Sequence, residues 1–225
     1  MSEPLSPEQQ AWQALVAQPL TFVDVRYLRE CWPLSVRDEQ YAAVSSDVRF
    51  EARRTALLSA HFGLPALAQL PPAATADLPV LLLSPEAFGQ LARRCGAIWH
   101  AATLSREIRG EAVSQLRHLL GNEVFALALA HRASGGAVDL LRQPTDLVEA
   151  IDRDGDIFVT AWVNSQSVGL RQWLRLRLPL PPAKSALPPQ SAPLASHLNG
   201  PLAATGLNIV RLAAATLSPR EEEAA

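Results

Sequence analysis

The sequence is poor in lysine and cysteine, and each shortage has a consequence. Lys184 is the one lysine among the 20 basic residues, so nearly every positive charge is an arginine. This bias runs over the whole chain, which favours GC-rich codon usage over a single arginine interface as its cause. The two cysteines, Cys31 and Cys95, form no CxxC pair, which excludes a disulfide framework or a cysteine-based zinc site. They indicate a reducing cytosol.

Strong net charge and long apolar runs are also missing. A formal net charge of −2 over 225 residues is not the electrostatic footprint of a general nucleic-acid binder. The longest strongly apolar run, residues 78–83, is far too short to cross a bilayer. Residues 1–10 are too acidic and polar for a signal peptide. We therefore expect a cytoplasmic protein that reaches a membrane only through another protein.

No catalytic or cofactor motif stands out. The sequence has no phosphate-binding loop, no dinucleotide fingerprint and no nucleophile elbow, and its histidines form no HExxH. Residues 152–156 (DRDGD) resemble the start of a calcium loop, but Val163 stands where a bidentate glutamate is needed. We predict instead an acidic turn that caps a helix beginning at Ile157. We expect no cofactor and no metal.

Cys95 and His100 are the residues from which a hidden catalytic site could be built. Cys95 falls on an apolar helix face, which predicts a buried free thiol. His100 is expected to hydrogen-bond a neighbouring carbonyl. The two are five residues apart and point in different directions on a helix, so a nucleophile pair would need partners from elsewhere, such as Asp154.

Helical periodicity dominates the chain and predicts a mainly α protein. Ser6, Pro7 and Gln9 have the spacing of a capped helix start, and Gly63 is expected to end a helix. The expected helices cover residues 7–17, 23–30, 36–44, 48–62, 85–102, 106–120, 124–131, 144–151 and 157–174, with a loop at 70–79. Leucines that alternate with Arg175 and Arg177 predict a short β element near 174–180.

One irregular helical domain is expected over residues 1–180, with a separate N-terminal helical part at 1–70 as an alternative. Residues 181–225 comprise a Pro-rich segment and a C-terminal helical extension that packs on this domain. Within that segment, residues 181–193 are rich in proline, alanine and serine, which is typical of a semi-rigid linker.

The stretch 91–120 is expected to form two helices in series. In the first, Arg93 and Arg94 point away from the centre of the apolar face. Ser105 is expected to cap the second helix, and Asn122 the helix that follows. The apolar face of the second helix contains Ile108, Ala112, Leu116, Leu119 and Leu120.

Five residues are candidates for contact with a partner protein. Trp12 lies near the N-terminus with little protein around it, so it is a partner anchor or a packing residue with equal support. Arg93, Arg94, Arg106 and Arg109 form a basic interface or, alternatively, solvated helix faces. The same alternatives hold for two other arginine sets, at residues 49, 53 and 54 and at residues 171, 175 and 177.

Two segments together resemble the SctK/YscK-like cytosolic accessory protein of bacterial type III secretion sorting platforms. Residues 91–120 resemble its central helical region, with a leucine–arginine lead-in, Gly96 four residues before His100, and the arginine/isoleucine stretch 105–109. Residues 169–180 (GLRQWLRLRLPL) resemble the tryptophan-plus-LRLPL ending of the family. The order and spacing of the two segments agree with the family.

The resemblance covers about residues 81–180 and implies a non-enzymatic adaptor. Such proteins lie beneath the needle-complex base, peripheral to the inner membrane. They link the cytoplasmic domain of the SctD-like inner-membrane ring protein to the SctQ-like pod protein, which in turn holds the stalk protein and the ATPase. The family has no catalytic residues to transfer. Two alternatives are a helical enzyme with a hidden site and a helical regulator or chaperone of another pathway.

Overall fold

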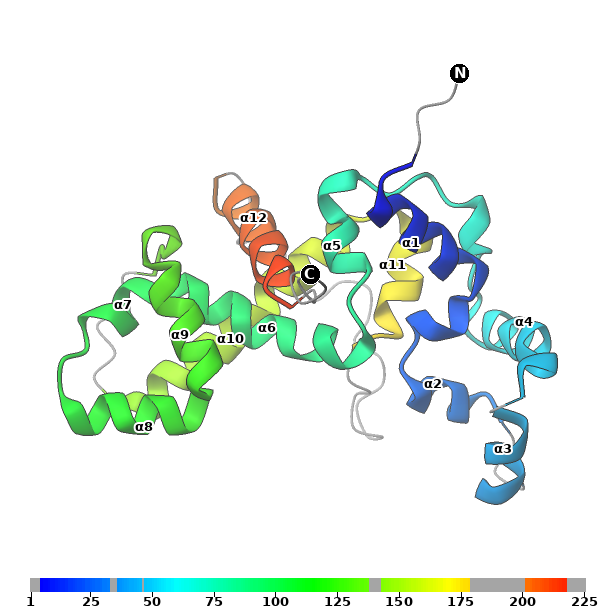
Figure 1. The fold of residues 1–225 in the computed structure, drawn as a ribbon, viewed down its shortest axis with the longest axis horizontal. Helices are drawn as coiled ribbons and strands as arrows, with labels where there is room; N and C mark the ends of the chain where they lie inside the picture. The colour runs from blue at the N-terminus through cyan, green and yellow to red at the C-terminus, as the bar shows by residue number, and fades with distance from the viewer. Residues whose placement is uncertain (1–4, 33–35, 46, 138–142, 179–200, 218–225) are drawn as a thin grey trace, which may run out of the picture. The chain divides into compact units, whose positions relative to one another are not determined.

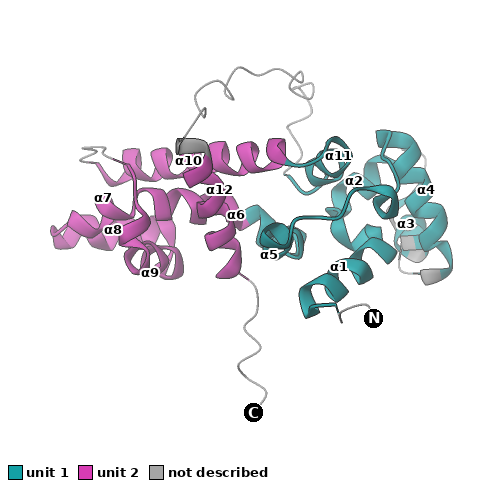
Figure 2. Ribbon diagram, turned by 90° about the horizontal axis from the view of Figure 1, so that it is seen from above, with its two compact units in different colours: residues 1–89, 166–190 teal, residues 90–165, 191–225 magenta. Residues whose placement is uncertain are grey.

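The computed structural model describes residues 5–32, 36–45, 47–137, 143–178 and 201–217 (Figure 1). These residues form twelve α-helices and several short 3-10 helices, and no strand occurs among them. The prediction of a mainly α protein is confirmed. The chain divides into two compact units, residues 1–89 with 166–190 and residues 90–165 with 191–225 (Figure 2). The domain bounds expected from the sequence, 1–180 and 181–225, stay predictions.

The first unit consists of short helices, because proline and glycine interrupt its sequence often. Its elements are α1 (Pro7–Ala17), the 3-10 helix η1 (Pro19–Phe22), α2 (Val25–Glu30), α3 (Asp38–Ser45), η2 (Val48–Phe50), α4 (Glu51–Phe62), η3 (Leu67–Gln69), η4 (Thr75–Asp77), α5 (Leu78–Leu81), the start of α6 (Pro85–Trp99) and α11 (Val168–Arg175). Helix α5 begins inside the stretch 70–79 that was expected to be a loop.

The ends of α1 and α4 follow from local backbone chemistry. The Ser6 hydroxyl oxygen accepts a hydrogen bond from the Gln9 backbone N–H at 3.2 Å. The Gln9 side-chain oxygen accepts one from the Ser6 backbone N–H at 2.9 Å, which completes the capping box. Gly63 ends α4 in the left-handed conformation, with φ of 64°. Both predicted helix ends are confirmed.

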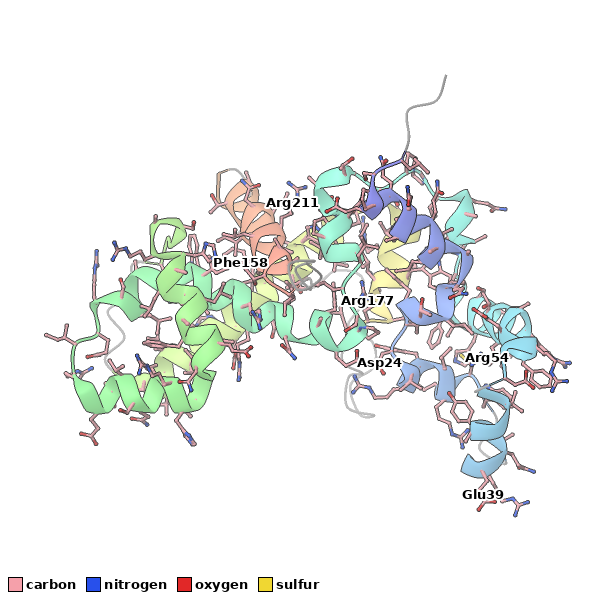
Figure 3. All side chains as sticks on the ribbon, in the orientation of Figure 1. Asp24, Glu39, Arg54, Phe158, Arg177 and Arg211 are labelled. Carbon is pink, nitrogen blue, oxygen red and sulfur yellow. The ribbon has the colours of Figure 1, made fainter. Side chains whose placement is uncertain are left out.

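Arg177 lies in the core of the first unit, where its side chain is 1% exposed (Figure 3). Its Cζ atom is 4.4 Å from the centroid of the Phe22 ring and 4.7 Å from that of Phe88. The guanidinium donates hydrogen bonds to the carbonyl oxygens of Leu81, at 3.0 Å, and Leu83. Burial lowers the pKa of Arg177 to about 9, so the group is still charged at neutral pH.

The short β element expected near 174–180 is wrong for the residues that the structure describes. Leu174 and Arg175 are the last part of α11, and the next two backbone N–H groups bond back three residues, to Trp173 and Leu174. This tight turn directs the Arg177 side chain into the core, whereas the expected strand would place it on the solvent-exposed face. Residues 179–180 lie outside the described residues.

The second unit contains the longest helix, α10, and the helices that pack on it. Its elements are the rest of α6, α7 (Ala101–Arg106), α8 (Gly110–Leu120), α9 (Asn122–Ala130), η5 (Arg132–Ser134), α10 (Pro144–Ser165) and α12 (Pro201–Ala215). Helix α10 packs against α8 and α12, and α7 packs against α9. On α10, Phe158 lies beside α12 (Figure 3), and a Cβ at Gly206 would stand 2.6 Å from its ring.

Helix α10 runs without interruption through residues 152–156. The expected acidic turn, and the two separate helices 144–151 and 157–174, are therefore wrong. Gly155 is buried in the middle of α10. Only glycine fits there, because a Cβ at this position would stand 1.9 Å from the Ala92 carbonyl oxygen of α6. A Cβ at Gly96 of α6 would likewise stand 1.9 Å from the Ile151 carbonyl oxygen. The two glycines therefore allow the backbones of α6 and α10 to cross in close contact within the second unit.

Two expected caps in the second unit are also wrong. Ser105 lies within α7, where its hydroxyl donates to the Ala102 carbonyl at 2.9 Å. Helix α8 begins only at Gly110, and Asn122 lies inside α9. The end of α8 is as predicted, because Gly121 follows it with φ of 85°. Within the described part of the chain, no helix is both long and apolar enough to span a membrane.

Candidate interaction surfaces

Trp12, the candidate partner anchor of the first unit, is half-buried on α1. Its ring meets the Phe22 ring edge-on, with centroids 6.2 Å apart and planes at 76°. Since Phe22 is itself buried against Arg177, Trp12 extends the core outward. The packing alternative thus has direct support. The role of its exposed part in partner binding stays a prediction.

A broad depression, the α1–α4 trough, lies close to Trp12 in the first unit. Val16, one helical turn after Trp12, lines one side of it. The volume of the trough is about 760 Å³, and Glu51 alone among its lining residues has a formal charge. The lining residues are Val16, Ala17, Pro19, Glu51, Ala52, Thr55, Ser59, Leu64, Ala66, Leu67, Ala68 and Trp173. Sequence periodicity had not predicted this feature, because residues distant in sequence form it.

The arginine pair on α6 divides into one exposed and one buried side chain. Arg93 is exposed and makes a two-point ion pair with Asp152 of α10, at 2.8 and 2.7 Å. Arg94 is 9% exposed, and its guanidinium lies 3.3 Å from the Glu123 carboxylate of α9. The expectation that both arginines point outward is wrong for Arg94. Each pair joins α6 to another helix, so both arginines contribute to the packing of the second unit.

The other two candidate arginines flank the link between α7 and α8. Arg106 is exposed at the end of α7. Arg109 is clamped to Glu107: the carboxylate accepts its backbone N–H and its Nε–H, both at 2.9 Å, and its Nη2–H at 2.6 Å. These bonds lower the pKa of Glu107 to about 2. Ile108, which lies between Glu107 and Arg109, is 90% exposed, so its expected place on the apolar face of α8 is wrong.

Of the residues considered for a hidden catalytic site, His100 and Asp154 are paired, and Cys95 is buried on α6, the helix that ends just before His100. Cys95 is fully buried as predicted, and burial raises the pKa of its thiol. The His100 Nε2 atom lies 2.8 Å from an Asp154 carboxylate oxygen, so this nitrogen is paired with a carboxylate rather than a carbonyl. Arg153 donates to the other oxygen of Asp154 at 2.9 Å. No reactive nucleophile results from this arrangement, because a buried thiol of raised pKa is a poor one.

The three carboxylates of the acidic run 152–156 have different surroundings and do not converge on one site. Asp152 pairs with Arg93 and Asp154 with His100. Burial, reinforced by Asp152, raises the pKa of Asp156. In the ranges that the structure covers, no three histidine, cysteine or acidic side chains are grouped so as to hold a metal ion.

The fold and its surfaces therefore define a helical protein in which four of the five candidate residues, Trp12, Arg93, Arg94 and Arg109, make packing contacts or ion pairs, while Arg106 is exposed. Comparison with known proteins gives a partial match. The chain is 32% identical over 85 residues to the nodulation protein NolU of Rhizobium fredii, which is 38% of this chain and 40% of the relative. The same figures hold for NolU of Sinorhizobium fredii (strain NBRC 101917 / NGR234). The match thus spans less than half the length of these relatives. No protein-family model and no solved structure matches the chain.

Proposed function

We propose that this protein is a non-enzymatic adaptor of a type III secretion sorting platform, which links the cytoplasmic domain of the inner-membrane ring protein to the pod protein. The observation that supports it most is the ordered pair of segments 91–120 and 169–180. Their apolar residues are core: Leu91, Ile98 and Trp173 are at most 1% exposed. Residues of this kind build a scaffold, in keeping with a binding role.

An adaptor needs two distinct binding surfaces, and the chain offers a candidate on each compact unit. The first unit has the α1–α4 trough close to Trp12. The second unit has exposed arginines, among them Arg106 and Arg109. In this proposal one surface binds the ring domain and the other binds the pod protein, which places the adaptor at the cytoplasmic side of the inner membrane.

The partial match to NolU supports a role in a bacterium that interacts with a host, since the relative is named for nodulation. Within that setting, the resemblance of residues 91–120 and 169–180 favours the secretion apparatus. A helical enzyme receives less support, because Cys95 is buried and Asp154 is engaged by His100 and Arg153. A regulator of another pathway differs from the adaptor in its genomic neighbours, which for the adaptor are secretion genes.

Size-exclusion chromatography of the purified full chain with each partner tests the proposal. The chain is expected to co-elute with the ring-protein domain, with the pod protein, and with both together as a ternary complex. Folding of the free chain is checked by its helical circular dichroism. If folded chain co-elutes with neither partner, the proposal is wrong.

A further inference from the structure

The link between α7 and α8 presents one aliphatic side chain to solvent far more fully than any neighbouring apolar residue. Ile108 is 90% exposed, whereas Leu104 on α7 is 1% exposed and Leu116 on α8 is 1% exposed. Both residues beside it, Glu107 and Arg109, have extended backbones with ψ of 115°. An isolated exposed apolar residue is common on protein surfaces, so its exposure alone would carry little weight.

The second observation is the clamp that holds this link in one shape. Three hydrogen bonds from Arg109 to the Glu107 carboxylate close over two residues, at 2.6 to 2.9 Å. The clamp fixes the backbone on both sides of Ile108, so that the side chain projects from a rigid base. Ordering a side chain before binding removes part of the entropy cost of association, which is the advantage of a preorganised contact.

The charges around Ile108 indicate what it would meet. The Glu107 side chain is 17% exposed, whereas that of Arg109 is 60% exposed, so the clamp turns its cation outward. Arg106 is exposed on the other side and has no ion-pair partner among the described residues. A surface that complements this one has an apolar pocket with carboxylates at its rim. A lipid surface fits less well, because stable membrane attachment needs a larger apolar face or a longer basic cluster.

We propose that Ile108 inserts into an apolar pocket on a protein partner, with carboxylates at the pocket rim that pair with Arg106 and Arg109. This inference rests on the proposed adaptor function, and names the chemistry of one of its two contacts. Glu107 acts as a positioning residue, since it holds Ile108 and Arg109 and does not itself face the partner.

Calorimetric titration of the full chain against the ring-protein domain and, separately, the pod protein tests this contact. Ile108→Ser is expected to weaken binding to one of the two partners by about tenfold or more, the loss expected for an aliphatic side chain that is buried on binding. Val168→Ser is the matched control, because Val168 is 69% exposed in the other unit, and its variant should bind within about twofold of wild type. Neither substitution alters the core, so both variants should fold.

Two further variants separate the roles around Ile108. Arg106→Glu is expected to weaken the same complex and to reduce its dependence on salt. Glu107→Ala removes the clamp while Ile108 remains, and is expected to weaken binding by a smaller factor than Ile108→Ser.

The outcomes distinguish this inference from the proposed function. If wild type binds a partner and Ile108→Ser binds both as tightly, the inference is overturned and the adaptor function stands. If Ile108→Ser instead loses binding to vesicles that contain anionic lipid, with protein binding unchanged, the contact is with a membrane and the inference is again overturned. If wild type binds neither protein, the proposed function is wrong, and the inference, which rests on it, is wrong as well.

Discussion

Gly155 of α10 lies so close to Ala92 of α6 that a Cβ atom at position 155 would stand 1.9 Å from the Ala92 carbonyl oxygen. Gly96 of α6 approaches the Ile151 carbonyl oxygen equally closely, so two glycines form one helix crossing in the second unit. A side chain at either position would force the backbones apart. The crossing places Arg93 opposite Asp152 and His100 opposite Asp154, and so sets the ion pairs of the unit.

Gly96→Ala is expected to lower the free energy of unfolding by about 3 kcal/mol, because the added methyl group overlaps backbone that cannot move independently. Gly89→Ala in the same helix is the control. A Cβ there meets nothing within 4 Å, so that variant should gain about 0.5–1 kcal/mol from reduced backbone entropy. Urea unfolding followed by circular dichroism measures both. Equal effects at the two positions would contradict the close crossing.

Arg177→Met is expected to cost about 3 kcal/mol of unfolding free energy, because it leaves the buried carbonyl oxygens of Leu81 and Leu83 without their donor. Arg175→Met should change stability by less than about 0.5 kcal/mol, since Arg175 is exposed. Arg177→Lys should fall between them, because an ammonium keeps the charge but loses the planar contact with Phe22 and Phe88. Thermal unfolding of the three variants checks this order. A stable Arg177→Met protein would refute the structural role.

The fold class and many helix ends could be predicted from the sequence because they depend on local chemistry. The capping box at Ser6 and the left-handed glycine at Gly63 involve residues at most a few positions apart. The errors occurred where distant contacts override local preference. DRDGD has the composition of a turn, but close approach to α6 requires a glycine inside a helix. Leucine–arginine alternation suggests a strand, but an aromatic cage draws Arg177 inward.

The candidate surface was predictable only in part, for the same reason. The sequence places Arg93, Arg94, Arg106 and Arg109 on helical segments but cannot tell that Arg94 is buried beside Glu123. It also cannot show that Ile108 falls in a link rather than on a helix face. The one local clue was the Glu107–Arg109 spacing, which allows a carboxylate to bond the backbone two residues on.

The Glu107–Arg109 clamp is expected to persist in mild acid. The pKa of Glu107 is lowered from 4.5 to about 2 in the folded protein, so the stability it contributes is complete above about pH 4.5 and is lost as pH falls through about 2. Carboxyl carbon NMR should show Glu107 ionised down to about pH 3. Arg109→Ala should raise its midpoint part of the way toward 4.5, because the guanidinium donors are gone while the backbone N–H of residue 109 remains. A wild-type midpoint near 4.5 would show that the clamp does not form in solution.

The two cysteines are expected to differ in reactivity toward a thiol reagent. Cys31 is half-buried and its thiol donates to the Tyr27 carbonyl at 3.3 Å, while burial raises the pKa of Cys31 to about 11. It should react slowly at about pH 8, since little thiolate is present. Cys95 is fully buried and its pKa is also raised, so it should react only when the second unit unfolds.

The Cys31→Ser variant leaves Cys95 as the one thiol of the chain, so that its labelling can be followed alone. In that variant, the labelling rate of Cys95 should rise with urea in parallel with unfolding of the helices, and Gly96→Ala should speed it by opening the crossing beside Cys95. In full denaturant, Cys31 and Cys95 of the wild-type chain should react at the same rate, which controls for reagent access. Rapid labelling of Cys95 in folded Cys31→Ser protein would mean that α6 is exposed in solution, against the packing on which the adaptor proposal depends.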